Sequence, residues 1–244
     1  MFNLYSNKTF VIMYHKIEEH KEGLKGICVR PKTFDRQMKY LYSRGFRTIP
    51  FKQLVEILKT KSKIPKKVFV LTFDDGYENN YTDAFPILKK YNFTATIFLN
   101  AGAIGKHYEY PRSGPAQKHL SAEQITEMSE LIDFGSHCIT HPVLTQISFN
   151  EVLEEIKTSK TIIEKITKKP VDTFCYPYGE YDRNIVDTVK KYYSGACTTK
   201  SCLVSENTDP YLIPRIELKE LRSMSFRDIK SMGTVLIIAT KPGG

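Results

Sequence analysis

Two adjacent carboxylates, Asp74 and Asp75, come at the end of the apolar run that begins with Val68–Leu71, just before Gly76. The run has the length and composition of a buried strand, so both carboxylates are expected at the rim of a core. Carboxylates are rarely placed there unless a metal, a cation or a reaction needs them, because burying a charge is costly. This strand end is therefore the first candidate for a functional site.

Two histidines four residues apart, His137 and His141, follow another short apolar run, Leu131–Phe134. One Asp and two His form a suitable ligand set for a divalent transition metal that keeps an open position for water. The second carboxylate is then left over to act as a base, so the combination predicts metal-assisted hydrolysis. Spacing alone does not rank Asp74 against Asp75, and the histidine pair by itself is also compatible with surface or capping residues.

Strand-like and helix-like segments alternate along the chain. Strands are predicted at Phe10–Tyr14, Val68–Leu71, Ala95–Leu99, Leu131–Phe134, Thr173–Tyr176 and Thr234–Ile238. Helices are predicted at Pro31–Arg44, Phe51–Leu58, Tyr77–Tyr91 with a kink at Pro86, Ser121–Glu130, Ser148–Thr167 and Asp182–Tyr192. Two of them open with a capping box, Ser121 with Gln124 and Ser148 with Glu151.

This alternation predicts an α/β fold with a parallel sheet, closed or nearly closed into a barrel, in one domain spanning residues 1–244. In such barrels the chemistry lies at the carboxyl ends of the strands. The candidate residues all follow predicted strands: His15, Asp74, Asp75, His137 and Tyr178.

The composition, 41% hydrophobic and 26% charged, is that of a globular protein, and no run of apolar residues is long enough to span a membrane. Met1–Phe10 is polar and mixed, unlike a signal peptide. Five cysteines without a Cys-x-x-Cys pair indicate neither a zinc knuckle nor a disulfide scaffold. We therefore expect a cytoplasmic protein, or an exported one if a leader has been removed.

The net charge of +9 raises the possibility of a nucleic-acid partner. However, the lysines are spread along the chain without a recognition-helix or stacking pattern, which argues against nucleic acid. The densest group, in the segment Lys59–Lys67, is interpreted as a solvated loop or as a peripheral contact with an anionic polymer or membrane surface.

Three motifs resemble those of the polysaccharide deacetylase family, also called carbohydrate esterase family 4 or the nodulation-type deacetylase homology domain. They are Thr72-Phe73-Asp74-Asp75-Gly76, Ser136-His137-x-x-Thr140-His141-Pro142 and Tyr176-Pro177-Tyr178-Gly179, in the family's order. The resemblance implies a distorted (β/α) barrel of about seven strands and one divalent metal, most often zinc, with cobalt as another possibility. It also implies hydrolysis of the acetamide of an N-acetylated sugar, usually N-acetylglucosamine.

The resemblance further implies a role for each site residue. Asp74 would be the general base, and the metal ligands would be Asp75, His137 and His141. The backbone N–H of Tyr178, after Pro177, would stabilise the tetrahedral oxyanion together with the metal.

The chain departs from the family pattern at three places. Cys175 stands where the third motif usually has an arginine, Cys138 follows the first histidine in place of Ser or Thr, and the late Leu-x-His motif is absent from Val235–Thr240. His15, in a Tyr-His opening similar to that of poly-N-acetylglucosamine deacetylases, is the candidate replacement for the general acid; otherwise it caps a strand end. Arg215 is the candidate for the missing arginine, or else an ordinary surface residue.

The leading hypothesis is thus a metal-dependent N-deacetylase of an N-acetylated glycan or lipid-linked amino sugar. One alternative is a non-catalytic glycan-binding relative that retains the metal site. Another is a basic protein that binds an anionic polymer through its lysines, which the spare carboxylate beside a metal site disfavours. The glycan, its linkage and the oligomeric state do not follow from the sequence.

Overall fold

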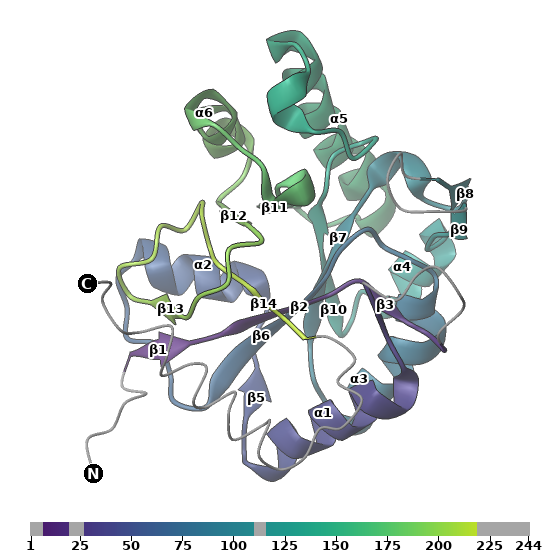
Figure 1. Ribbon diagram of the computed structural model, residues 1–244, viewed down its shortest axis with the longest axis vertical. Helices are drawn as coiled ribbons and strands as arrows, with labels where there is room; N and C mark the ends of the chain where they lie inside the picture. Colours follow the sequence, from purple (N-terminus) through teal and green to yellow (C-terminus); the bar gives the residue numbers. More distant parts are fainter. Residues whose placement is uncertain (1–6, 20–26, 110–115, 219–244) are drawn as a thin grey trace.

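A curled, parallel β-sheet forms the centre of the computed structural model, which describes residues 7–19, 27–109 and 116–218 (Figure 1). Seven strands follow one another in the order β12-β11-β10-β7-β6-β2-β14. Their bounds are β2 (Val11–Tyr14), β6 (Val68–Phe73), β7 (Ala95–Leu99), β10 (Ile132–Ser136), β11 (Thr173–Cys175), β12 (Gly195–Cys197) and β14 (Ile216–Glu217). An eighth strand, β5 (Arg47–Thr48), pairs with the start of β6. The predicted α/β fold with a distorted barrel is confirmed.

One short segment connects the two ends of this strand path. Ile213 forms a parallel bridge with Cys197 of β12, and β14 pairs with Ile12 and Met13 of β2. The first and last strands of this sheet in chain order, β2 and β14, therefore lie side by side, although almost the whole described chain separates them (Figure 1).

The six α-helices of the described residues lie around this sheet (Figure 1). They are α1 (Pro31–Ser43), α2 (Phe51–Lys59), α3 (Phe85–Tyr91), α4 (Ala122–Met128), α5 (Phe149–Thr167) and α6 (Arg183–Tyr192). The capping boxes predicted at Ser121 and Ser148 are both present, each with its two reciprocal hydrogen bonds. None of the helices in the described ranges is long and apolar enough to cross a membrane.

Shorter elements complete the fold. Three two-stranded pairs flank the sheet: β1 (Lys8–Thr9) with β13 (Val204–Ser205), β3 (Lys16–Ile17) with β4 (Cys28–Val29), and β8 (His107–Tyr108) with β9 (Gln117–Lys118). Single helical turns occur at η2 (Ala101–Ala103), η3 (Leu144–Gln146) and η4 (Pro177–Gly179).

The helix predicted over Tyr77–Tyr91 is confirmed from Asn80 onward and wrong at its start. Tyr77 forms an antiparallel bridge with His119, and helical structure begins only with the π-helical turn η1 (Asn80–Ala84), which continues into α3. Pro86, which has no N–H to donate, is the second residue of α3, which follows this π-helical turn directly. The strand predicted at Thr234–Ile238 lies outside the described residues.

The packing of β6 orients the strand end that carries the two carboxylates. All six residues of β6 are buried. Phe69, Leu71 and Phe73 belong to the larger buried cluster, whereas Val68 and Val70 belong to a smaller cluster that includes residues of α2, Cys175 and Cys197. Because side chains alternate along a strand, Asp74 continues the face of Val68 and Val70. The strand thus directs Asp74 toward the smaller cluster.

Candidate metal centre

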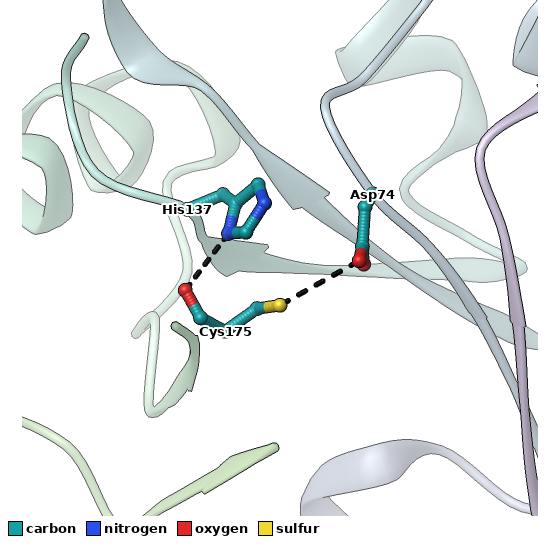
Figure 2. A group of neighbouring side chains, drawn as sticks. All are labelled: Asp74, His137 and Cys175. Carbon is teal, nitrogen blue, oxygen red and sulfur yellow. Dashed lines mark hydrogen bonds between the residues drawn. The ribbon is translucent and has the colours of Figure 1, made fainter. Parts of the chain in front are cut away.

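The carboxyl ends of neighbouring strands bring the candidate residues together. Asp74 and Asp75 follow β6, and His137 follows β10, with β7 pairing to both strands. Cys175 ends β11, the next strand. Figure 2 shows Asp74, His137 and Cys175 facing one another from these elements. In a parallel sheet this convergence is the expected place for a site.

Asp75, His137 and His141 place three potential ligand atoms around one point. The Asp75 Oδ1 lies 3.7 Å from the His137 Nε2 and 3.6 Å from the His141 Nε2, and the two Nε2 atoms are 3.1 Å apart. Ligands about 2.1 Å from one tetrahedral ion lie roughly 3.4 Å from each other. The three separations therefore match those expected around a single ion.

The polar groups of this cluster also fit a metal. The Asp75 Oδ1 is buried and makes no hydrogen bond among the described residues, which is costly unless a cation satisfies it. The Nδ1 of His137 is 2.8 Å from the backbone carbonyl oxygen of Cys175. Donation from Nδ1 to that oxygen leaves the Nε2 lone pair for an ion, the usual support of a metal-binding histidine.

The electrostatics of the two imidazoles favour a positive charge at their shared centre. Burial alone would lower the pKa of His137, but Cys175 and the carboxylates of Asp74 and Asp75 raise it to about 9. Burial and the neighbouring His137 lower the pKa of His141 to about 4. The cluster thus favours one positive charge between the two rings, a place that a metal ion could take from a proton.

Asp74, His137 and Cys175 form a second group close enough for a metal (Figure 2). It is less suitable, because both oxygens of Asp74 are already paired with Arg215. Burial also raises the pKa of the Cys175 thiol well above its usual value, which opposes the thiolate that a metal needs. Asp75, His137 and His141 are therefore the better ligand set.

Arg215 forms a fully buried, bidentate ion pair with Asp74. Its Nη1 and Nη2 donate to the two carboxylate oxygens, each at 2.7 Å. Further bonds from Nε to the Thr198 carbonyl (3.0 Å) and from Nη1 to the Thr72 hydroxyl (3.2 Å) hold the guanidinium in place. Burial would raise the pKa of Asp74, but the charge and hydrogen bonds of Arg215 hold it well below the usual range. Asp74 is therefore ionised at neutral pH.

The structure also brings His15 and the third motif to this centre. The His15 Nε2 is 3.9 Å from the Asp74 Oδ2, and its side chain is 19% exposed. The ring of Tyr178 packs edge-on against His141 with centroids 4.5 Å apart, and Pro177 is buried. All the residues predicted for the site thus lie together, while their individual roles stay predictions.

Strained backbone is concentrated at the same place. Of the nine described non-glycine residues with positive φ, four are Asp75, Cys138, His141 and Tyr178, with φ between 58° and 72°. Left-handed backbone is unfavourable for such residues and tends to persist where the surrounding structure enforces it. The loops of all three motifs are therefore held in special conformations.

Two residues that contact either a proposed ligand or the loop between the two histidines were missed by the sequence analysis. Tyr77 is buried and donates a hydrogen bond to the Asp75 carboxylate, but it was assigned to a helix. Glu155 hydrogen-bonds to the loop between the two histidines, although its position on a helix gave no such signal. Cys138 and Cys175 are buried, as expected of small filling residues, yet Cys175 also lies 3.1 Å from the Arg215 Nη2.

Comparisons with known proteins agree with the motifs. The family model described as polysaccharide deacetylase matches residues 61–194. YxkH of Bacillus subtilis (strain 168), which is provisionally named as a polysaccharide deacetylase, is 30% identical over 210 residues, or 85% of this chain and 70% of that protein. The poly-beta-1,6-N-acetyl-D-glucosamine N-deacetylase of Staphylococcus aureus is 26% identical over 239 residues, or 88% of this chain and 80% of that protein.

Solved structures give the same result. The Streptococcus pyogenes deacetylase PplD, in complex with acetate, superposes with a TM-score of 0.80 at 26% identity, covering 97% of this chain and 100% of that one. A polysaccharide deacetylase from Bacillus cereus has a TM-score of 0.77 at 30% identity, covering 93% and 69%.

Proposed function

Since this chain belongs to the polysaccharide deacetylase family, we propose that it is a metal-dependent hydrolase that removes N-acetyl groups from an N-acetylated amino sugar or glycan. The names of the relatives, including a poly-beta-1,6-N-acetyl-D-glucosamine N-deacetylase, favour a substrate that contains N-acetylglucosamine.

A single observation carries the proposal. Three ligand atoms of Asp75, His137 and His141 surround one point, and an ionised carboxylate that is not part of this set, Asp74, lies beside them. A protein that only bound glycans would not need a spare buried base next to a metal site.

Amide hydrolysis needs help at both reacting partners, because the carbonyl is a weak electrophile and water a weak nucleophile. A divalent metal held by Asp75, His137 and His141, zinc in our proposal, would polarise the carbonyl and lower the pKa of a water molecule. Asp74 accepts the proton of the attacking water, and Arg215 keeps this carboxylate ionised and correctly oriented. The lowered pKa makes Asp74 a weak base. Proton transfer to Asp74 therefore requires a water molecule whose own pKa has been lowered by the metal.

The departing amine must gain a proton, and the developing oxyanion needs a donor. His15, 3.9 Å from Asp74, is the proposed general acid, acting directly or through one water. The backbone N–H of Tyr178 is the proposed oxyanion donor, since preorganised N–H groups stabilise the charge that develops on a carbonyl oxygen.

Acetate release from N-acetylglucosamine oligomers tests the function. Protein from which a chelator has removed the metal should be inactive, and its activity should return when zinc or cobalt is added. His137→Ala should lose both metal and activity, because one of three ligands is removed. The surface variant Lys157→Ala, on the exposed face of α5, serves as the control. Metal binding without acetate release from any oligomer would support the alternative, a non-catalytic glycan-binding relative.

The lysine-rich segment, residues 59–67, is the proposed contact with an anionic polymer or membrane surface. Lys59, Lys61, Lys63, Lys66 and Lys67 are exposed and come just before β6. They therefore lie at the amino end of the strands, away from the carboxyl ends that carry the metal centre. Contact of this segment with an anionic surface would leave the site facing outward. A cytoplasmic location is part of the proposal.

A further inference from the structure

The loop between the two histidine ligands is held by a residue from a different element. Cys138 and His141 at its ends both have left-handed backbone, with φ of 69° and 59°. Such a loop does not maintain its shape by itself, because non-glycine residues disfavour this conformation. Its shape sets where the imidazole of His141 lies relative to that of His137.

Glu155, on α5, supplies hydrogen bonds to this loop from one side. Its Oε2 accepts from the backbone N–H groups of Ile139 (2.6 Å) and Thr140 (3.0 Å). Its Oε1 accepts from the Thr140 hydroxyl at 2.5 Å. Glu155 is only 9% exposed, so these three bonds take the place of the water that a carboxylate would otherwise need.

The turn η2 holds the loop from the other side. The N–H groups of Ala101 and Gly102 donate to the carbonyl oxygens of Cys138 and Ile139, at 2.9 and 2.8 Å. The approach is so close that a Cβ at Gly102 would lie 2.5 Å from the Ile139 oxygen. The loop is thus fixed through its carbonyls by η2 and through its N–H groups by Glu155.

We propose that Glu155 is a positioning residue of the metal centre: by fixing the Cys138–His141 loop it sets the spacing of the two imidazoles, and thereby the affinity for the metal. The inference rests on the proposed metal-dependent function. Partners of this kind, one step removed from the ion, typically change metal affinity by about 10–100-fold when they are removed.

Two substitutions separate the reach of the side chain from its charge. Glu155→Gln keeps the length and can still present an oxygen to the two backbone N–H groups, while its amide can donate to the Thr140 hydroxyl. Glu155→Asp keeps the charge but draws the carboxylate back by one methylene. If hydrogen bonding positions the loop, the Gln variant should retain more metal affinity than the Asp variant.

The experiment measures zinc affinity by competition with a chromophoric chelator, and the visible absorption of bound cobalt as a signature of ligand geometry. Glu155→Ala should bind zinc about 10–100-fold more weakly and show an altered cobalt spectrum, Glu155→Asp should also be weakened, and Glu155→Gln should stay close to the wild type. Glu154→Gln is the matched control, because Glu154 is the preceding residue on α5 and is exposed.

Several results would overturn the inference. One is an Ala variant that is less stable but binds zinc as tightly as the wild type, since Glu155 would then only support folding. Another is a Gln variant as weak as the Asp variant, since charge and not reach would matter. Should the Ala variant not fold, the comparison of Gln with Asp decides alone. Zinc binding without acetate release refutes the proposed function and leaves this inference standing; no zinc binding at all refutes both.

Discussion

Replacing Arg215 by Met should reveal how strongly the fold depends on the buried ion pair. Arg215 is fully buried and makes two 2.7 Å bonds to Asp74. Removing one partner of such a pair leaves the other charge buried and uncompensated, at about 3–5 kcal/mol. In a protein of this size each kcal/mol lowers Tm by about 2–4 °C. The expected loss is therefore about 6–20 °C at neutral pH.

The pH dependence of this loss follows from the pKa of Asp74. In the wild type Arg215 holds the folded-state pKa of Asp74 well below its usual value. The ionised carboxylate therefore stabilises the fold fully at pH values above its unfolded-state pKa of about 3.9. This stabilisation is lost only as the pH falls toward the lower, folded-state pKa. In the variant burial is opposed only by the smaller effects of His137 and His15. We therefore expect the folded pKa of Asp74 to rise, so that the variant loses stability as pH rises. The difference between the two proteins should therefore grow from about pH 4 to pH 8.

Urea unfolding of the metal-free proteins at pH 5 and pH 8 measures the effect, because chelation removes the contribution of metal binding. Arg183→Met, at an exposed arginine, is the control and should change little. The reasoning also predicts that Arg215→Met costs much less in an Asp74→Asn background. A cost near the about 1 kcal/mol of a surface ion pair, or one that is the same at both pH values, would refute it.

Four further substitutions test the site and the backbone around it. Asp74→Asn should retain the metal but lower kcat by about 10²–10⁴-fold; unchanged kcat in the metal-loaded variant would contradict the base assignment. His15→Ala should also bind metal normally and slow amide cleavage while sparing an activated ester whose leaving group needs no proton; equal losses on both substrates would indicate a structural role. Gly105→Ala should cost about 1–2 kcal/mol in urea unfolding because its φ is +73°. Gly179→Ala should cost more, since its φ is +71° and its Cβ would lie 2.1 Å from the Thr199 hydroxyl oxygen; equal costs would show that Thr199 moves aside.

Local signals in the sequence were sufficient for much of the frame. A capping box involves residues three apart, so the starts at Ser121 and Ser148 could be predicted without tertiary information. The gathering of Asp74 and His137 followed from a general property of parallel sheets, whose carboxyl ends lie at one edge. The strand β14 is only two residues long, which is too short to show the alternation of apolar and polar residues that identifies a strand.

Contacts between distant parts of the chain were harder to predict. Glu155 is separated from Ile139 by 16 residues, and on an amphipathic helix a glutamate is expected to face water; only the packing of α5 buries it. Arg215 could be suggested as a site residue because the third motif has Cys175 in place of its usual arginine. Its bidentate pairing with Asp74, however, depends on the closure of the sheet. Tyr77 was misplaced because its apolar spacing continued that of the following helix.

The closure of the sheet by residues 213–217 also determines when Asp74 can be buried as an anion. Asp74 and its guanidinium partner are 141 residues apart in the chain, and the partner lies between the bridge to β12 and the pairing with β2. During synthesis the carboxylate is therefore made long before its counter-ion, and it cannot be buried as an anion at low cost until residues 213–217 are in place. Completion of the described sheet and burial of the ionised Asp74 are consequently a single late step, so a chain that stops short of this segment should achieve neither.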